Sequence, residues 1–511
     1  MPGREERCAS CASVGAMIRR PQRYYRGWAA FASTSAFAAA SPIVTGCLPD
    51  NPTVETSSAS GSGGESESES DGAGGEGLLA CDLPSCTFVV VSQTLDDRVD
   101  IFDVSASPQL RGRVVLDLKP DPSGLQTAGN LLDEPYGIDV VDGELRILLG
   151  HYPDTKLGSL VVLPEGLFAG LQAGSVIDTV EFFDGVNFVE PVRGLELDRQ
   201  EAIFALSHSS GRTIIGVFAN DARALEWPNA SQLLIVDPSR EGAAAIGAFD
   251  MGSLDVPCRG AWGIAAVDDL QAPQRVALAC DGSDSVAMLE LPQNLGELSP
   301  AGAASAISGC GVELLGAGWT TRFVARDGSG GALALQSQLV KGPRIWRVGG
   351  ACEVLPATES VAKGFSGVRT LAEPVLLQGG ATPTWLVAGG VPETGIYVIR
   401  GADPTLCGKV SGLEGVFTPP GGQANAPYSL ALTPDGRQLA IGSGPPSNPE
   451  SAEGRGQVHW LTLDTAEIEA CEIAATEVVE LTGGAFVGTD PQTWVRAPNV
   501  IKIVQRSGVG T

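Results

Sequence analysis

Short apolar runs separated by Gly, Pro, Asp and Asn dominate the chain from about residue 78 onward. Few apolar residues recur at the three- and four-residue spacing of an amphipathic helix. Short apolar runs bounded by turn residues predict β-strands, so the pattern predicts an all-β body. The clearest predicted strands are 88–91, 99–104, 114–118, 146–149, 160–163, 202–206, 233–236, 276–279, 385–388 and 396–399.

One pair of predicted strands recurs along the body. It consists of an apolar strand, a short turn and a second apolar strand that ends in small or polar residues. The clearest copy is Pro427–Gly442, in which Pro434, Asp435 and Gly436 supply a tight hairpin turn. The first strand of each copy begins at Tyr136, Arg193, Trp262, Thr321, Arg369, Tyr428 and Thr493, at intervals of 57, 69, 59, 48, 59 and 65 residues.

A unit of this length with four strands predicts a β-propeller. One four-stranded sheet cannot hide both of its apolar faces, whereas sheets packed around an axis bury them and protect their edges. Residues 88–118 supply three strands before the first repeat, and the seventh repeat begins near the end of the sequence. We therefore expect the C-terminal strand to complete the first of seven blades. A β-sandwich array or several small β domains are the alternatives.

The segment Ser429–Ile441 resembles the WD-repeat and YVTN-type propellers, a fold also found in lactonase-like and quinoprotein-like proteins. The resemblance covers residues 78–511 in architecture, but only one or two blades in sequence. The Gly-His and Trp-Asp signature of WD repeats is absent. The resemblance implies a seven-bladed fold, and it admits a lactonase-like hydrolase or a quinone-dependent dehydrogenase.

Residues 1–46 have the features of an export signal peptide. Four arginines between residues 19 and 26 precede the uncharged run Gly27–Ala40, which is too short to span a bilayer as a permanent helix. The run leads to Val44–Cys47, which resembles the lipobox of bacterial lipoproteins, and this resemblance implies a lipid on Cys47. Met17 would also serve as the start. The alternative is an ordinary secretory signal cut near Ala40.

Residues 47–77 are predicted to be a flexible, disordered and acidic tether. Residues 48–77 contain no basic residue and are rich in Ser, Gly and Glu, so they cannot bury enough apolar area to fold. The remaining segment, 78–511, is the predicted propeller domain. Leu48 follows Cys47 where many inner-membrane lipoproteins have Asp, and that resemblance favours an outer-membrane lipoprotein facing the periplasm or the cell surface.

Charge and cysteine content add two constraints. The chain has 33 Lys and Arg against 60 Asp and Glu, a net charge of −27, which argues against binding to nucleic acid. Eight cysteines follow residue 77, and an even number in an exported chain suggests up to four disulfides. Cys258 precedes a predicted first strand and Cys280 ends the next one, so their antiparallel pairing predicts a Cys258–Cys280 disulfide.

Residues that begin inner strands, or end second strands, should gather at one mouth of a propeller channel. Four arginines in this set could bind an anionic ligand through bidentate contacts. In the alternative, each pairs with a neighbouring acid and stacks on an aromatic ring. Two histidines could hold a metal or act as a base, or could be solvated loop residues. The predicted mouth contains Arg193, Arg259, Arg322, Arg369, Trp262, Tyr136, Tyr428, His151 and His208.

Catalytic and cofactor motifs give little further guidance. The sequence has no GxSxG elbow, phosphate loop or dinucleotide fingerprint. No cofactor is predicted, although acidic turns such as Asp281–Asp284 could bind calcium. We therefore expect a monomeric, lipid-anchored binding or scaffold propeller at the cell envelope, without enzymatic activity, that engages a protein or an envelope polymer through one face. A lactonase-like hydrolase or quinoprotein-like dehydrogenase is the alternative.

Overall fold

The computed structural model describes 21 segments of the body, and all of them belong to one compact unit, Thr56–Thr511. The predicted signal peptide, Cys47 and the tether lie outside the described residues. The described segments are 83–93, 97–116, 134–141, 143–150, 158–168, 174–182, 184, 188–197, 200–219, 230–268, 270, 272–314, 320–337, 343–355, 368–377, 381–392, 394–401, 404–418, 425–444, 456–482 and 498–507.

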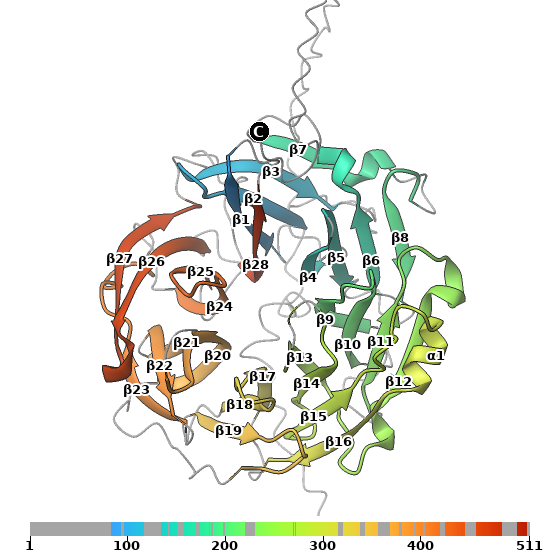
Figure 1. Ribbon diagram of the computed structural model, residues 1–511. Helices are drawn as coiled ribbons and strands as arrows, with labels where there is room; N and C mark the ends of the chain where they lie inside the picture. Colours follow the sequence, from blue (N-terminus) through green and yellow to red (C-terminus); the bar gives the residue numbers. More distant parts are fainter. Residues whose placement is uncertain are drawn as a thin grey trace, which may run out of the picture. The chain divides into compact units, whose positions relative to one another are not determined.

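Seven β-sheets surround a common centre and form the blades of a propeller (Figure 1). Blade 1 has the order β28-β1-β2-β3-β7, and blade 2 has the order β4-β5-β6-β8. Blade 3 has β9 at the inside and continues through β10, β11 and β12. The strands of these three blades are β1 (Ser85–Gln93), β2 (Arg98–Asp103), β3 (Gln109–Val115), β4 (Glu134–Val141), β5 (Glu144–Gly150), β6 (Ser159–Leu163), β7 (Ser175–Asp178), β8 (Arg193–Glu196), β9 (Gln200–Ser207), β10 (Thr213–Ala219), β11 (Gln232–Val236), β12 (Ile246–Asp250) and β28 (Pro498–Ser507).

Blades 4 to 7 follow in chain order, each beginning with its inner strand. Blades 4, 6 and 7 have four strands, and the described part of blade 5 has three. Their strands are β13 (Ala261–Ala266), β14 (Arg275–Cys280), β15 (Ser285–Glu290), β16 (Ser308–Glu313), β17 (Thr320–Arg326), β18 (Ala332–Ser337), β19 (Arg344–Val348), β20 (Val368–Leu377), β21 (Thr384–Pro392), β22 (Gly395–Arg400), β23 (Thr405–Lys409), β24 (Ala426–Leu432), β25 (Gln438–Gly444), β26 (Gln457–Glu467) and β27 (Glu472–Glu480).

Helices are short in the described part of the chain. The only α-helix there is α1 (Pro300–Ser305), which begins after the side-chain cap of Ser299. None of the described helices is long and apolar enough to cross a membrane. The 3-10 helices are η5 (Glu165–Phe168), η6 (Thr179–Phe182), η7 (Gly242–Ala245), η8 (Met251–Ser253) and η9 (Ile468–Ala470).

The C-terminal strand closes the ring, as the sequence predicts. Strand β28 pairs antiparallel with β1 and forms the inner strand of blade 1, with Gln93 opposite Pro498 and Ser85 opposite Ser507. The Ser92 hydroxyl accepts a 3.0 Å hydrogen bond from the Val500 amide and lies 3.1 Å from the Tyr136 carbonyl, to which it donates. Ser92 of β1 therefore bonds both to the closing strand and to blade 2.

Buried apolar side chains alternate along the strands and fill the space between neighbouring blades. In β1, Phe88 and Val90 belong to the core shared with blade 2, while Val89 and Val91 belong to the core shared with blade 7. This follows from the two-residue period of a strand, which sends successive side chains to opposite faces. Each blade is thus apolar on both faces and is stable only between its neighbours.

The prediction that Arg193 begins an inner strand is wrong. Arg193 begins β8, the outermost strand of blade 2, and the inner strand of the next blade is β9, which begins at Gln200. The cause is an excursion of the chain after β6. It crosses to blade 1, where β7 pairs in parallel with β3, before it returns as β8. The fourth strand of blade 2 therefore appears where a new inner strand was expected.

The disulfide predicted within blade 4 is present. Cys258 and Cys280 are bonded with a Cα–Cα distance of 5.2 Å, and both residues are fully buried. The bridge closes a loop with a sequence separation of 22 residues. Loop closure of this length stabilises a fold by about 3 kcal/mol in the chain-entropy model.

Two further disulfides connect neighbouring blades at the perimeter. Cys310 in β16 joins Cys352 of blade 5, and Cys407 in β23 joins Cys471 of blade 7. In both bridges the second cysteine has a positive φ, 66° for Cys352 and 62° for Cys471. Cavities of about 210 Å³ and 590 Å³ lie beside the first and second bridge, respectively. The outer edges of these blades are thus covalently linked.

Candidate ligand-binding face

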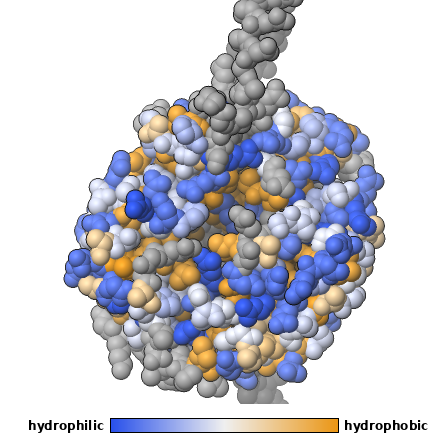
Figure 2. All heavy atoms as spheres, in the orientation of Figure 1, coloured by the Kyte–Doolittle hydropathy of each residue, from blue (hydrophilic) through white to orange (hydrophobic). Residues whose placement is uncertain are grey.

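The inner strands begin on one side of the ring, which we call the front face, and end on the other, the back face. Antiparallel pairing makes the second strands end on the front face. Contacts between blades agree with a common direction, because Ser92 at the end of β1 bonds to Tyr136 at the start of β4. In the view of Figure 2, hydrophobic residues border the centre of the ring among hydrophilic ones.

Register shifts near the front face recur in the inner strands, and in four of these strands an aromatic or arginine side chain lies at the shift. In β13, Ala261 pairs with Cys280 and Gly263 with Ala279, so Trp262 is an extra residue on the inner strand. The same type of register shift occurs in β4, β17 and β24. β-bulges re-aim side chains and are common next to functional sites. The residues at the four bulges are Tyr136, Trp262, Arg322 and Tyr428, which we call the bulge residues.

Arg322 is held between Trp262 and Asp281. Its guanidinium carbon lies 4.5 Å from the centroid of the Trp262 ring, and its Nε lies 3.0 Å from Oδ2 of Asp281. Asp281 follows β14, so the second strand of blade 4 brings its carboxylate to the inner strand of blade 5. The Asp281 side chain is 1% exposed and that of Arg322 is 11% exposed. Arg322 therefore shows the paired and stacked arrangement that was the alternative to an anion-binding role.

Burial and the ion pair act on Asp281 in opposite directions. Loss of hydration raises the pKa of the Asp281 carboxyl, and the charge and hydrogen bond of Arg322 oppose this, with a net increase. Asp281 Oδ1 and Arg322 Nη1 have no hydrogen-bond partner among the described residues. This pair is thus fixed in place with part of its hydrogen-bonding capacity unused.

The remaining predicted mouth residues are not brought into one cluster within the described part of the structure. Arg259 lies on the front face before β13 and is exposed, and its amide donates to Ser283 Oγ. Arg369 lies on β20 near the start of that inner strand, and its side chain is outside the described part of the structure. His151 is also outside the described residues.

Arg193 and His208 lie on the back face, not at the predicted mouth. His208 follows the inner strand β9, where a second strand was expected to end. Its Nδ1 lies 2.8 Å from Ser210 Oγ. Arg193 contacts Glu144, which begins the second strand of blade 2. Both errors have the same cause. Because an inner strand was predicted to begin at Arg193 instead of at Gln200, the predicted chain direction through residues 193–208 is the reverse of the observed one.

Buried polar groups near the front face could not be identified from sequence. Asp100 in β2 is fully buried and accepts a 2.6 Å hydrogen bond from Arg113 Nε, with Arg98 Nε at 3.4 Å. In blade 5, Trp346 Nε1 donates to Gln336, whose amide nitrogen lies 3.1 Å from Thr321 Oγ1. Their partners lie on neighbouring strands, so no short motif marks them. Within the described segments, no group of three or more His, Cys, Asp or Glu residues is arranged to bind a metal.

His459 is a buried histidine in the third strand of blade 7. It is 3% exposed, and its ring meets Phe417 edge to face with 5.9 Å between centroids. Its Nδ1 has no hydrogen-bond partner among the described residues, and Glu480 is its Cα neighbour across the β26–β27 pair. Burial lowers the pKa of His459 from 6.5 to about 4.

This pKa predicts a loss of stability in mild acid. The unfolded chain binds a proton at His459 near pH 6.5, whereas the folded chain binds it only near pH 4. Between these values protonation favours unfolding, so the free energy of unfolding should fall by roughly 3 kcal/mol as pH falls through this range. Urea unfolding of wild type and His459→Gln at several pH values would isolate the effect. An unchanged pH slope in the variant would contradict it.

Comparisons with known proteins identify no family. Neither protein-family models nor curated proteins give a match. The periplasmic gluconolactonase PpgL of Pseudomonas aeruginosa is 12% identical, with a TM-score of 0.48 over 82% of this chain and 99% of that chain. A protein from Lactobacillus plantarum gives 12% identity and a TM-score of 0.47, with the same coverage of both chains. Apo AztD from Citrobacter koseri gives 10% and 0.39, over 84% and 99%.

Proposed function

We propose that the chain is a non-enzymatic binding protein of the cell envelope, exported and held to a membrane by a lipid on Cys47. The observation that supports binding is the set of bulge residues at equivalent places on the front face. Three of the four are aromatic and the fourth is an arginine. Tyr, Trp and Arg are the residue types that supply most of the energy at protein interfaces.

The geometry of Arg322 favours a preformed binding surface. Its ion pair with Asp281 and its stacking on Trp262 restrict the side chain before any ligand arrives. Ordering a long side chain opposes association, so a side chain that is already fixed lowers that cost. Tyr136 and Tyr428 are only 8% and 7% exposed, so Trp262 and Arg322 would make most of the contact with a protein or an envelope polymer.

The disulfides support the proposed export. Structural disulfides persist in oxidising compartments such as the periplasm and are rare in the cytosol. Three bridges are present in the described segments, and two of them link separate blades.

The lipid anchor is proposed from the sequence Val44–Cys47. A Cys47→Ser variant should therefore move from the membrane fraction to the soluble periplasmic fraction, and unchanged fractionation would count against the anchor.

Substitution of the bulge residues tests the binding role. We expect Trp262→Ala combined with Tyr428→Ala to weaken capture of the envelope ligand by about 30-fold or more, the effect of losing one strong interface residue. Capture from solubilised envelopes by the immobilised protein, followed by titration of the isolated ligand, measures the effect. Val176→Ala is the matched control, because Val176 is 60% exposed on the outer strand β7. Equal affinity of the double variant and the control would contradict the proposal.

A stoichiometric metal ion in purified protein would instead favour a hydrolase.

A further inference from the structure

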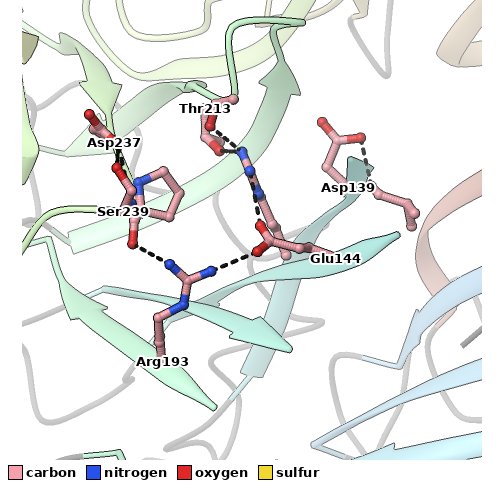
Figure 3. Close-up of polar contacts among 10 residues, drawn as sticks. Asp139, Glu144, Arg193, Thr213, Asp237 and Ser239 are labelled. Carbon is pink, nitrogen blue, oxygen red and sulfur yellow. Dashed lines mark hydrogen bonds and ion pairs between the residues drawn. The ribbon is translucent and has the colours of Figure 1, made fainter. Parts of the chain in front are cut away.

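On the back face, where blades 2 and 3 meet, Arg193 lies between Glu144 and the turn that contains Asp237 and Ser239 (Figure 3). Glu144 is shared by two arginines. Its Oε2 lies 3.1 Å from Arg146 Nη2 and its Oε1 lies 2.6 Å from Arg193 Nη2. The Glu144 carboxylate thus forms ion pairs with two guanidinium groups.

Asp237 forms a second group of the same composition. Its Oδ2 lies 3.4 Å from Arg212 Nη2 and 2.9 Å from Arg240 Nε. Burial raises the pKa of Asp237, but hydrogen bonds from Ser239 and Arg240 and the charge of Arg212 lower it overall. The two groups are joined by Arg193, whose Nη1 donates a 3.0 Å hydrogen bond to the Pro238 carbonyl. Three arginines, Arg193, Arg212 and Arg240, therefore contact residues of the turn at 237–240.

The two groups together have an excess of positive charge. Four arginines and two carboxylates give 4 − 2 = +2, in a chain whose net charge is −27. Arg146 Nε and Arg212 Nη1 are buried without a hydrogen-bond partner among the described residues. No further described contact of Arg146 or Arg212 therefore neutralises the excess positive charge of the two groups.

The four arginines divide into a buried pair and an exposed pair. Arg146 is 5% exposed and donates to the Gly211 carbonyl and to Thr213 Oγ1 of blade 3. Arg212 is 4% exposed and donates to the Leu298 carbonyl of blade 4. These two side chains connect neighbouring blades. Arg193 and Arg240 are 35% and 46% exposed, so the surplus charge is available to solvent through this second pair.

We propose that Arg193 and Arg240 bind a phosphate group, or another doubly charged oxyanion, on the back face at the 237–240 turn. Both side chains are anchored to this turn, Arg193 through Pro238 and Arg240 through Asp237. Guanidinium groups match the geometry of such oxyanions through paired hydrogen bonds. The buried arginines add positive potential beneath the site. The phosphate could be a free ion or part of an envelope polymer, and this back-face site is independent of the front-face binding proposed above.

Thermal unfolding and calorimetric titration with orthophosphate and with polyphosphate test the site. We expect a saturable rise in melting temperature for the wild type, beyond that produced by sodium chloride at equal ionic strength. Arg193→Gln combined with Arg240→Gln should remove this rise. The matched control is Arg437→Gln, because Arg437 is an exposed back-face arginine beside Asp435, and this variant should respond as the wild type does.

The outcomes separate the sources of the phosphate and keep the site falsifiable. A response to orthophosphate that is absent in the double variant supports a site for the free ion, and a response to polyphosphate alone supports a site for a polymer. If the Gln variants do not fold, Arg193→Lys with Arg240→Lys keeps both charges and should bind phosphate about tenfold more weakly than wild type. The absence of any saturable response in wild type, or an equal response in a folded double variant, overturns the proposal.

Discussion

A body that ends at residue 497 should fail to form a cooperative fold, whereas residues 78–511 should unfold in one cooperative transition. Removing β28 exposes the whole inner edge of β1 and takes away Val500 and Ile501, both 2% exposed. It also removes the strand that packs between the inner strands of blades 2 and 7. The expected loss is comparable to the entire 5–15 kcal/mol stability of an ordinary domain. Circular dichroism during thermal unfolding measures it.

A permuted chain provides the control for this truncation. Ser85 and Ser507 are opposite each other in the β1–β28 pair, so an Asn-Gly turn can join them as a hairpin. The new ends would lie between β3 and β4. This chain keeps every strand pair and should fold. Its N- and C-terminal strands belong to different blades, whereas in the native chain both belong to blade 1. A truncated body that unfolds at the same temperature as the full body would refute the closing role of β28.

Asp100→Ala should destabilise the body by about 3–5 kcal/mol, the range found when one partner of a buried ion pair is removed. The carboxylate is fully buried, and it faces Arg113, which is 13% exposed, and Arg98, which is 6% exposed. Without Asp100, two guanidinium groups would stay buried close together with their central counter-ion gone. Chemical denaturation at neutral pH measures the change in the free energy of unfolding.

The control for this substitution is Asp268→Ala. Asp268 also pairs with an arginine, but its side chain is 26% exposed and lies 3.7 Å from Arg275 Nε. Partly exposed pairs of this kind contribute about 0–1 kcal/mol. Equal destabilisation by the two substitutions would show that burial of Asp100 does not determine its effect.

The number of blades and the closure of the ring could be predicted because both follow from local signals. Apolar runs and turn residues mark strands, and the repeat length sets the number of strands per blade. The pairing of the C-terminal strand with β1 then follows from counting strands at the two ends of the body, whereas its register does not. The Cys258–Cys280 bridge could be predicted for the same reason, because strand order places its two cysteines together.

The error at Arg193 shows where the local signal fails. The same pattern of an arginine or aromatic followed by Gly and an apolar residue has two different causes. In β13, a side chain on Gly263 would lie 2.6 Å from the Arg322 carbonyl of the next blade. In β8, a side chain on Gly194 would clash with the Phe188 ring. The sequence shows a glycine in both places and cannot show which neighbour requires it.

The candidate sites depended on contacts between blades, which sequence spacing does not reveal. Tyr136, Trp262, Arg322 and Tyr428 could be predicted as a set because they share a position in the repeat. The partner of Arg322 could not, since Asp281 lies 41 residues away on another blade. Of the back-face arginines, Arg193 was predicted on the wrong face and the other three were missed, because their convergence depends on the turn at 237–240 and on the late position of β8.

The position of β1 between β28 and β2 in blade 1 determines how the body responds to mechanical tension. Strand β1 is bonded along one edge to β28 and along the other to β2. If a membrane tether pulls on the chain ahead of Ser85 along the axis of β1, both ladders are sheared at once. Their hydrogen bonds then resist together instead of opening one after another, as they would in a strand peeled from an edge. A protein built this way would withstand pulling on the chain that enters β1.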